Sequence, residues 1–447
     1  MVAIALMANG ILVSDRLQLL GALAAASLAP IFSSESRAGG PQQTSLEATA
    51  GTLSLRPGQA QTLVWSLQAE AAGLSSALRV RSGGQLDIAL HNTLGVPVVP
   101  NWRGIDGAPS SEPLIAQMAL APGAKGRLTV PLPRGGGTCL CDLRLLADGE
   151  ARPSRPLPVV VEEAALGTAD RDEVVLVEDW RLRLDGTAMP PGIDAQDTAP
   201  SYTVNGQIQP DFAVRQNERL RLRLVNGCQR AVIALKIENH EVRVMALDGQ
   251  PAEPFYARNS ALVLAPGGRA DCFIDAVGQP DSIAQIALHD GKEARPVARL
   301  VVSAEAPARP SPLPPGSALP TNGLPAELDL KSALRVELVL NGSDWTKPAS
   351  FSASTTPAFR TRARRVVVLA LINRADIATV FHLHGHHFRL LDRLDDGWKP
   401  FWLDTLAVEP GQIQRIAFLA EHAGRYLLES AATDWAAPKL VRWYAVE

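Results

Sequence analysis

Residues Leu220–Asn226 read LRLRLVN, in which leucines alternate with arginines. Successive side chains of a β-strand point to opposite faces of a sheet, so the leucines would share one face. The pattern therefore predicts a half-buried strand. Two further segments have the same form and also end in asparagine, namely Leu86–Asn92 (LDIALHN) and Val367–Asn373 (VVLALIN). The three asparagines lie 134 and 147 residues apart, which indicates an internal repeat.

A Pro-Gly pair follows each of these segments, at Pro122-Gly123, Pro266-Gly267 and Pro410-Gly411, with a spacing of 144 residues both times. The chain has 447 residues, a length that suits three domains of about 150 residues. We therefore expect three copies of one unit. The predicted units span residues 45–163, 172–304 and 326–447, and a proline-rich linker at 305–325 joins the last two.

The composition indicates an all-β globular protein. The 35 glycines and 34 prolines interrupt many short alternating segments, as is typical of β-sandwiches. With 43 basic and 46 acidic residues the net charge is -3, which argues against a nucleic-acid partner. Past the N-terminus no run of about 20 apolar residues occurs, so we expect no membrane span in the mature chain.

The N-terminal region has the features of an export signal over residues 1–38. An apolar stretch at Leu17–Phe32 precedes small residues at Ser36-Arg37-Ala38, where a signal peptidase would cleave. Ser14-Asp15-Arg16 resembles a twin-arginine signal that lacks its first arginine. A core helix or an uncleaved anchor are the alternatives. The segment predicts a periplasmic protein, exported by the twin-arginine route.

Four cysteines are present. Cys139 and Cys141 lie two apart, and such close neighbours in a strand rarely form a disulfide. Whether Cys228 and Cys272 pair stays open at this point. No CxxC redox or zinc motif occurs.

Four of the eight histidines lie in Phe381–Phe388, which reads FHLHGHHF. In an extended strand His382, His384 and His386 would project to one side. Imidazoles at that spacing suit copper or zinc, so these three histidines are candidate metal ligands. The alternative is a polar strand end with hydrogen-bonded histidines.

The histidine run is followed by Trp402–Thr405 (WLDT) and by Pro410-Gly411. This combination resembles the third copper-ligand motif of multicopper oxidases. Other stretches resemble further parts of that family: Asn92–Gly107 its first motif, Gly137–Arg144 its second, Tyr202–Gly206 and Val242–Pro254 its middle domain, and Gly424–Tyr426 the approach to its fourth motif. The resemblance implies three tandem cupredoxin-like Greek-key β-sandwich domains, with copper sites in the third domain and between the first and third.

The resemblance also implies a type 1 copper held by cysteine and histidine, and a three-copper cluster held by histidines. Of those ligands, His382 and His384 persist at matching positions. The other matching cluster positions carry Asn101, Arg103, Asp142, Arg144 and Glu429. The positions that match the type 1 site carry Thr379, Ser430, Trp435 and Leu440.

These replacements predict a different kind of interface between domains 1 and 3. Arg103 and Arg144 would pair with Asp142 and Glu429, because buried charges are tolerated only when paired and hydrogen-bonded. Asn101 and the two histidines would act as neutral partners. Trp435 and its neighbours in the former type 1 pocket would form a packed plug, unless these residues are ordinary exposed ones.

The main functional prediction is therefore an exported protein that is not an enzyme, has no cofactor, and acts as a scaffold for an unidentified envelope protein partner. In its loss of ligands it resembles a copper-free cell-division member of the superfamily. The alternative is a copper- or zinc-binding, oxidoreductase-like protein that uses His382, His384 and His386, with Glu429 or Asp142 as an oxygen ligand.

Overall fold

The computed structural model describes residues 41–447, apart from residues 57, 59, 70–76, 164–168, 196–197 and 393–396. The predicted export signal at residues 1–38 lies outside the described residues, so the periplasmic location stays a prediction. Within the described part of the chain, no helix is long and apolar enough to cross a membrane.

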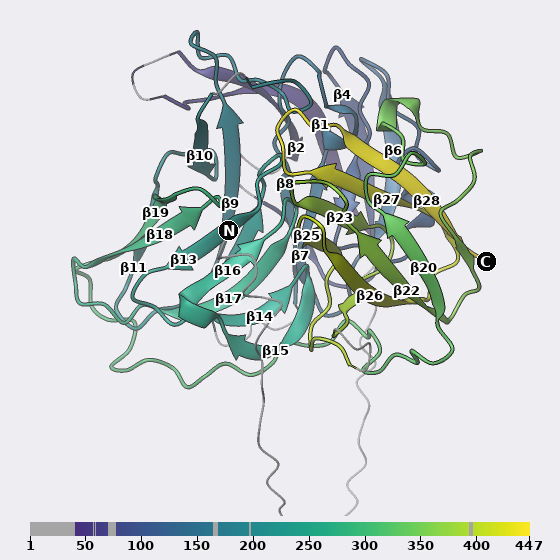
Figure 1. Ribbon diagram of the computed structural model, residues 1–447. Helices are drawn as coiled ribbons and strands as arrows, with labels where there is room; N and C mark the ends of the chain where they lie inside the picture. The colour runs from purple at the N-terminus through teal and green to yellow at the C-terminus, as the bar shows by residue number, and fades with distance from the viewer. Residues whose placement is uncertain are drawn as a thin grey trace, which may run out of the picture.

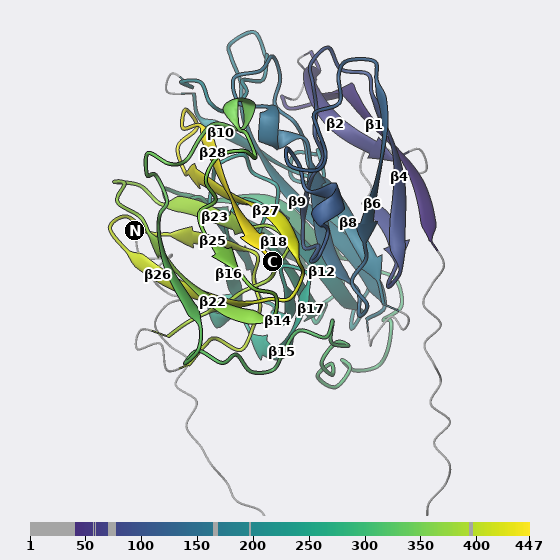
Figure 2. The same ribbon diagram turned by 90° about the vertical axis from the view of Figure 1, so that its right-hand side faces the viewer.

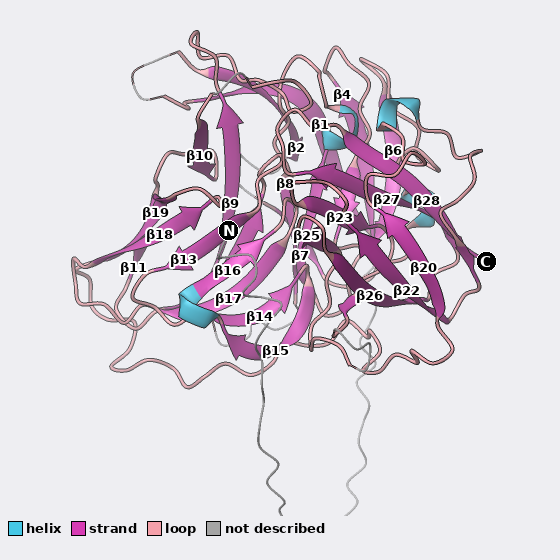
Figure 3. Ribbon diagram, in the orientation of Figure 1, coloured by secondary structure: helices cyan, strands magenta, loops and turns pink. Residues whose placement is uncertain are grey.

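The described residues form six β-sheets, and helix is confined to short 3-10 turns such as η2 (Pro109–Ser111) and η3 (Arg144–Leu146) (Figure 3). The sheets pair into three β-sandwich domains, which confirms the predicted all-β class. Figures 1 and 2 show the purple-to-blue strands of domain 1 and the green-to-yellow strands of domain 3 on different sides of the molecule, with the teal strands of domain 2 beside both.

Domain 1 packs a sheet of order β2-β1-β4-β6 against one of order β3-β8-β7-β5. Its strands are β1 (Gln42–Leu53), β2 (Thr62–Ala69), β3 (Leu78–Arg81), β4 (Gln85–Asn92), β5 (Asn101–Arg103), β6 (Lys125–Pro131), β7 (Gly137–Asp142) and β8 (Leu157–Glu162). Alternate residues of β4 are buried, among them Leu86, Ile88 and Leu90, and they contribute to the core of the sandwich.

Domain 2 has sheets of order β10-β9-β12-β17-β14-β15 and β11-β19-β18-β13-β16. Its strands are β9 (Arg171–Arg181), β10 (Pro200–Val204), β11 (Asp211–Val214), β12 (Arg219–Asn226), β13 (Ile233–Ile237), β14 (Arg243–Leu247), β15 (Gln250–Tyr256), β16 (Ala261–Leu264), β17 (Arg269–Asp275), β18 (Ile283–His289) and β19 (Ala294–Val302).

Domain 3 has sheets of order β20-β22-β26-β24 and β21-β28-β27-β23-β25. Its strands are β20 (Leu334–Val339), β21 (Arg360–Thr361), β22 (Arg365–Ile372), β23 (Thr379–Leu383), β24 (Arg389–Leu390), β25 (Thr405–Val408), β26 (Ile413–Ala420), β27 (Gly424–Ala432) and β28 (Lys439–Val446). Strand β27 pairs with both β23 and β28, so it lies inside its sheet.

The prediction that β12 is half-buried is wrong, because all eight of its residues are buried. Its leucines pack into the core of domain 2, as expected. Arg221 on the other face bonds Glu163 and Asp271, while Arg223 bonds Asp172 and the Thr138 hydroxyl of domain 1. The sequence pattern showed the polarity of this face, but not that another domain covers it.

The cysteine question left open by the sequence is settled by the structure. Cys139, Cys141, Cys228 and Cys272 are all buried free thiols, so Cys228 and Cys272 do not pair.

The repeated asparagines have one structural role in all three domains. The Asn373 amide donates to the carbonyl oxygens of Ile377 and Val408, both at 2.8 Å, and its side-chain oxygen accepts the Ala375 N–H at 2.9 Å. Asn92 and Asn226 make the corresponding three bonds to their own loops. The Gly123 and Gly267 amides in turn donate to the backbone oxygens of Asn92 and Asn226.

We expect Asn373→Ala to destabilise the protein by about 2–4 kcal/mol, because two carbonyl groups and one N–H lose a buried partner. Thermal unfolding of the full chain would check this, with Asn341→Ala as the control, since Asn341 is exposed. Equal midpoints for the two variants would contradict the role assigned to the repeated asparagine.

Candidate metal centre

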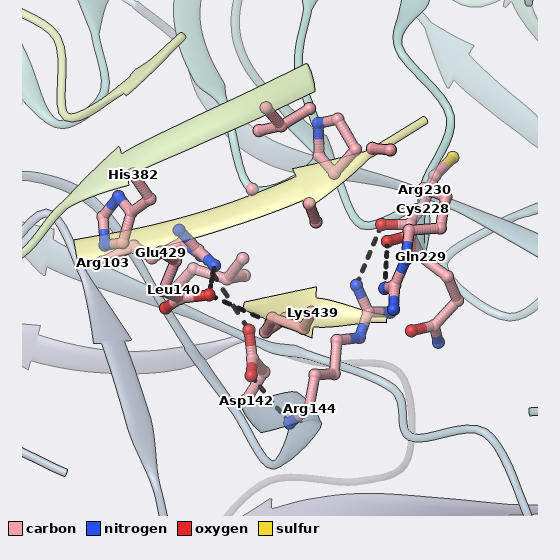
Figure 4. A pocket seen from close by; sticks show the side chains of 15 residues that line it. Arg103, Leu140, Asp142, Arg144, Cys228, Gln229, Arg230, His382, Glu429 and Lys439 are labelled. Carbon is pink, nitrogen blue, oxygen red and sulfur yellow. Dashed lines mark hydrogen bonds and ion pairs between the residues drawn. The ribbon is translucent and has the colours of Figure 1, made fainter. Parts of the chain in front are cut away.

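Four strands from two domains bring the site together. Strands β5 and β7 of domain 1 place Asn101 opposite Asp142, and β23 and β27 of domain 3 place His382 opposite Glu429. Figure 4 shows side chains from these strands converging between the domains. Each strand turns one face toward the interface between the two domains, because its opposite face packs on the core of its own domain.

His382, His384 and Glu429 form a group whose ligand atoms all lie within 4.8 Å of one another. All three side chains are buried. It is the one group of three or more candidate ligands found among the described residues. Two imidazole nitrogens and a carboxylate oxygen are a donor set that suits a single copper or zinc ion.

His382 is held as a neutral imidazole. Its Nδ1 lies 2.9 Å from the Asp404 carbonyl oxygen and 3.1 Å from the Thr405 hydroxyl. Burial, and after it the nearby Arg103, lowers its pKa well below the ordinary value. Nδ1–H therefore donates to the Asp404 carbonyl, and Nε2 carries a lone pair that no hydrogen bond uses. Metal-binding histidines are oriented in the same way by a backbone carbonyl.

His384 lies between two carboxylates. Its Nδ1 is 2.8 Å from Glu112 and its Nε2 is 2.8 Å from Glu429. Burial opposes its protonation, but Glu112 and then Glu429 outweigh burial and raise the pKa to about 9. A metal ion at Nε2 would take the place of the proton that this pair shares.

His386 does not join this group, which corrects the expectation that three histidines project to one side. Strand β23 ends at Leu383, and Gly385 has a φ of +73° that turns the chain. His386 bonds the Tyr444 hydroxyl at 2.7 Å and accepts the His422 N–H at 3.2 Å. Burial lowers its pKa to about 3, so it is a neutral core histidine.

Glu429 is the centre of a cation cluster. It accepts hydrogen bonds from Asn101 at 2.7 Å and Arg103 at 3.1 Å, and Lys439 lies 3.2 Å away. Burial opposes ionisation of Glu429, but Arg103 and Lys439 outweigh it and hold its pKa well below the ordinary value. Arg103 lies 4.0 Å from Asp142. These contacts join β5 of domain 1 to β27 and β28 of domain 3.

Arg144 lies two residues beyond Asp142, but its guanidinium group does not bind a carboxylate. That group donates to the backbone oxygens of Ser154, Gly227 and Cys228 at 2.9, 2.6 and 3.0 Å. Asp142 accepts only the backbone N–H of Arg144, at 2.8 Å. Arg144 therefore fastens domain 1 to domain 2, a role that its sequence position did not predict.

The residues at the positions that the resemblance matched to a type 1 copper site are packed inside the protein, except that Leu440 is half-buried. Thr379 donates to Asn373 at 3.3 Å, Ser430 to the Leu340 oxygen at 2.6 Å, and the Trp435 indole to the Pro190 oxygen at 2.9 Å. None of the four presents a thiolate or an imidazole, and Trp435 ties domain 3 to domain 2.

The sequence interpretation missed two residues of the site, Glu112 and Lys439. Glu112 follows a short 3-10 turn in a loop that carries no recognisable motif. Lys439 on β28 is paired with Ala431 on β27. Ala431 lies two residues beyond Glu429, on the same face of β27. Placing Lys439 beside Glu429 requires the strand register, which the sequence did not provide.

The comparisons with known proteins agree with this architecture. Two family models described as multicopper oxidase match residues 172–296 and 327–447. The multicopper oxidase MmcO of Mycobacterium tuberculosis is 25% identical over 408 residues, which cover 78% of this chain and 77% of the relative. A multicopper oxidase structure from Pseudomonas thermotolerans superposes with a TM-score of 0.76 at 23% identity, covering 91% of this chain and 99% of the other. Lac15 from a marine microbial metagenome gives a TM-score of 0.73 at 24% identity, covering 91% and 100%.

The fold and the site thus define a three-domain protein of cupredoxin architecture with a buried metal-ligand group at the interface of its first and third domains. The chain belongs to the multicopper oxidase superfamily.

The prediction of a non-catalytic scaffold protein is contradicted by these comparisons. The relatives carry the names of multicopper oxidases and laccases, including laccase-1 of Thanatephorus cucumeris at 24% identity over 229 residues. The family implies copper, and a buried group that can hold a metal is present. The prediction equated the loss of most copper ligands with the loss of the metal. The comparisons favour the alternative, a metal-binding oxidoreductase-like protein.

The residues present fit one ion and do not fit a copper cluster. Among the described residues one ligand group exists, and Arg103 and Lys439 occupy the space next to it with positive charge. The unbonded lone pair of His382 is the feature that a single ion would satisfy.

Proposed function

We propose that this chain binds one copper ion, or alternatively one zinc ion, through His382, His384 and Glu429, and is an oxidoreductase-like protein when it holds copper. The observation that carries the proposal is the unbonded Nε2 of His382, a buried lone pair on a residue of the three-ligand group. Buried polar atoms without a partner are rare, so this one calls for a ligand.

The surroundings of the three ligands support the proposal. The Asp404 carbonyl orients His382, Glu112 binds the far nitrogen of His384, and Asn101 fixes Glu429. Such outer contacts hold first ligands in place and tune the basicity of an imidazole. A bound copper ion would supply one-electron redox chemistry, whereas zinc would act only as a Lewis acid.

The protein's own groups set the electrostatic conditions for that ion. Glu112 and Glu429 bring two negative charges to His384, while Arg103 and Lys439 bring two positive charges to Glu429. The ion must therefore replace the His384 proton instead of adding a charge to a neutral site. Metal affinity should rise with pH for that reason.

The test is a metal titration of the full, chelator-treated chain by calorimetry, with metal content measured after dialysis. We expect about one copper or zinc ion per chain, and at least about a tenfold loss of affinity for His382→Gln and for Glu429→Gln. His91→Gln is the matched control, because His91 lies on β4 and takes no part in the group.

Two results would overturn the proposal. One is the absence of stoichiometric binding to a folded chain, and the other is an equal loss of affinity in His91→Gln. Electron paramagnetic resonance of the copper-loaded chain gives a second readout, because nitrogen coupling from two imidazoles should fall to one in His382→Gln.

A further inference from the structure

A cavity borders the metal-ligand group on the side of domain 2. It lies between Arg103 and Asp142 of domain 1, the Cys228–Arg230 and Pro266-Gly267 segments of domain 2, and β27 and β28 of domain 3 (Figure 4). About 40 Å³ of it is open to the centre of a water molecule. One water needs about 10–15 Å³ by this measure, so the cavity has room for three or four atoms of that size.

The wall of the cavity carries more positive than negative charge. Its cations are Arg103, Arg144, Arg230 and Lys439, and its anions are Asp142 and Glu429. Arg230 bonds Asp148 at 2.7 Å, so that pair is neutral. The remaining lining side chains are three cations and two anions, and the buried Asp179 beside the cavity interacts with Arg144 and Arg230.

Arg103 also has hydrogen-bond donors without an acceptor. Its Nη2 bonds Glu429, but Nε and Nη1 are buried and make no hydrogen bond, although the side chain is only 7% exposed. The Asp142 oxygen 4.0 Å from Nε is too distant for one. Arg144, by contrast, spends its donors on three carbonyl oxygens. The unmet donors in this wall therefore belong to Arg103.

Gly267 packs closely against this guanidinium. A Cβ atom at that position would lie 2.7 Å from the Arg103 Nε, closer than any side chain tolerates. The glycine has a φ of +86°, a conformation that favours glycine at the Pro-Gly turn. The Pro-Gly turn of this domain thus brings its backbone against the Arg103 guanidinium at the edge of the cavity.

We propose that this cavity binds one small, planar, monovalent oxyanion, of the class of nitrate, formate and bicarbonate, with Arg103 as its hydrogen-bond donor and Lys439 as a second cation. The oxygen atoms of such an anion would satisfy the N–H groups of the guanidinium that have no acceptor. Sulfate and phosphate are larger and carry more charge, so a planar monovalent anion suits this space better.

The anion site and the metal site use different atoms. The anion binds N–H donors of Arg103, whereas the metal binds the lone pairs of His382 and His384 and an oxygen of Glu429. The proposal therefore does not depend on the metal, and each site can be tested without the other.

The experiment is calorimetric titration of the full, chelator-treated chain with sodium nitrate, formate or bicarbonate. Sodium gluconate keeps the ionic strength constant, because gluconate is too large for the cavity. We expect saturable binding of one nitrate per chain, and no binding of sulfate. Arg103→Gln should weaken nitrate binding by at least about tenfold.

Ala431→Val is the second variant, and it keeps every charge. Ala431 lines the cavity and lies two residues beyond Glu429 on β27, so a larger side chain there fills the cavity. It should also abolish nitrate binding while the thermal midpoint in gluconate shows that the chain is folded. Arg299→Gln, which removes an exposed arginine, should leave nitrate binding unchanged.

No nitrate binding to the folded chain would overturn the proposal and would indicate that water fills the cavity. Equal binding in Ala431→Val, or sulfate binding as strong as nitrate binding, would place the anion on the surface and would also overturn it. Copper binding measured in gluconate separates the two proposals. If the chain binds copper but not nitrate, only the anion proposal is rejected. If it binds nitrate but not copper, only the metal proposal is rejected.

Discussion

Replacing Arg269 by alanine should destabilise the protein by about 3–5 kcal/mol, because it removes one partner of a buried ion pair. Arg269 is completely buried and donates to Asp404 at 2.8 and 3.2 Å, and to the backbone oxygens of Thr138 and Asp248. The Asp404 carboxylate also accepts the Gly104 N–H at 2.7 Å. The guanidinium therefore joins all three domains, and without it a buried carboxylate loses its main counter-charge.

The chain provides a matched control for this prediction. Arg299 and Asp211 make an equally well-formed two-bond pair at 2.6 and 2.8 Å, but on the surface. Surface ion pairs contribute little, so Arg299→Ala should leave the thermal midpoint nearly unchanged. If both variants unfolded at the wild-type temperature, the role of Arg269 as the junction of the domains would be refuted. Asp404→Leu in the Arg269→Ala background should recover part of the loss, because no unpaired charge remains.

The second large effect is a loss of stability in alkaline solution that originates at His387. Its Nδ1 lies 2.8 Å from Asp106 of domain 1, and its Nε2 donates to the Asp248 oxygen at 2.9 Å. Burial opposes protonation, but Asp106 outweighs it and raises the pKa to about 9. The folded-state pKa lies above the unfolded value of about 6.5, so the protonated form of His387 stabilises the folded protein. This stabilisation is fully present below pH ~6.5. That stabilisation, about 3 kcal/mol, is lost as the pH rises through about 9.

Urea unfolding midpoints between about pH 6 and pH 10 would measure this effect, because that range spans both the unfolded and the folded pKa. Asp106→Asn keeps the shape of the side chain and removes its charge, so the alkaline part of the profile that belongs to His387 should flatten. His384 titrates in the same range, and its contribution should persist in that variant because it pairs with Glu112 and Glu429. A profile of Asp106→Asn that matches the wild type would contradict the assignment to His387.

Much of the fold could be predicted from the sequence, because its repeating features have local causes. Alternating leucines specify a strand, and the asparagine at its end bonds the loop that follows and a residue two positions before the Pro-Gly turn of the same domain. The same three bonds recur at Asn92, Asn226 and Asn373. The sequence shows this repeat as an asparagine at the end of each of the three strands. The burial of both faces of β12 was not visible, because it depends on domain 1 covering the arginines.

The candidate site divides in the same way. The sequence identified His382, His384, Arg103 and Glu429 by their positions in motifs, and the structure brings them together. The sequence alone could not exclude His386 from the metal-ligand group. The chain turns at Gly385, where its backbone packs closely against the Tyr426 ring.

What the sequence by itself determined is the periodic pattern: three β-sandwich units, their asparagine and Pro-Gly signals, and the kinds of charge at the positions that match the family's copper ligands. Tertiary structure alone decided which charges meet. Glu112 lies 272 residues before His384, and Lys439 lies ten residues after Glu429. Only domain packing brings the first pair to 2.8 Å, and only strand register brings the second to 3.2 Å. Electrostatic energy depends on distance in space and on burial, and neither can be read from spacing along a chain.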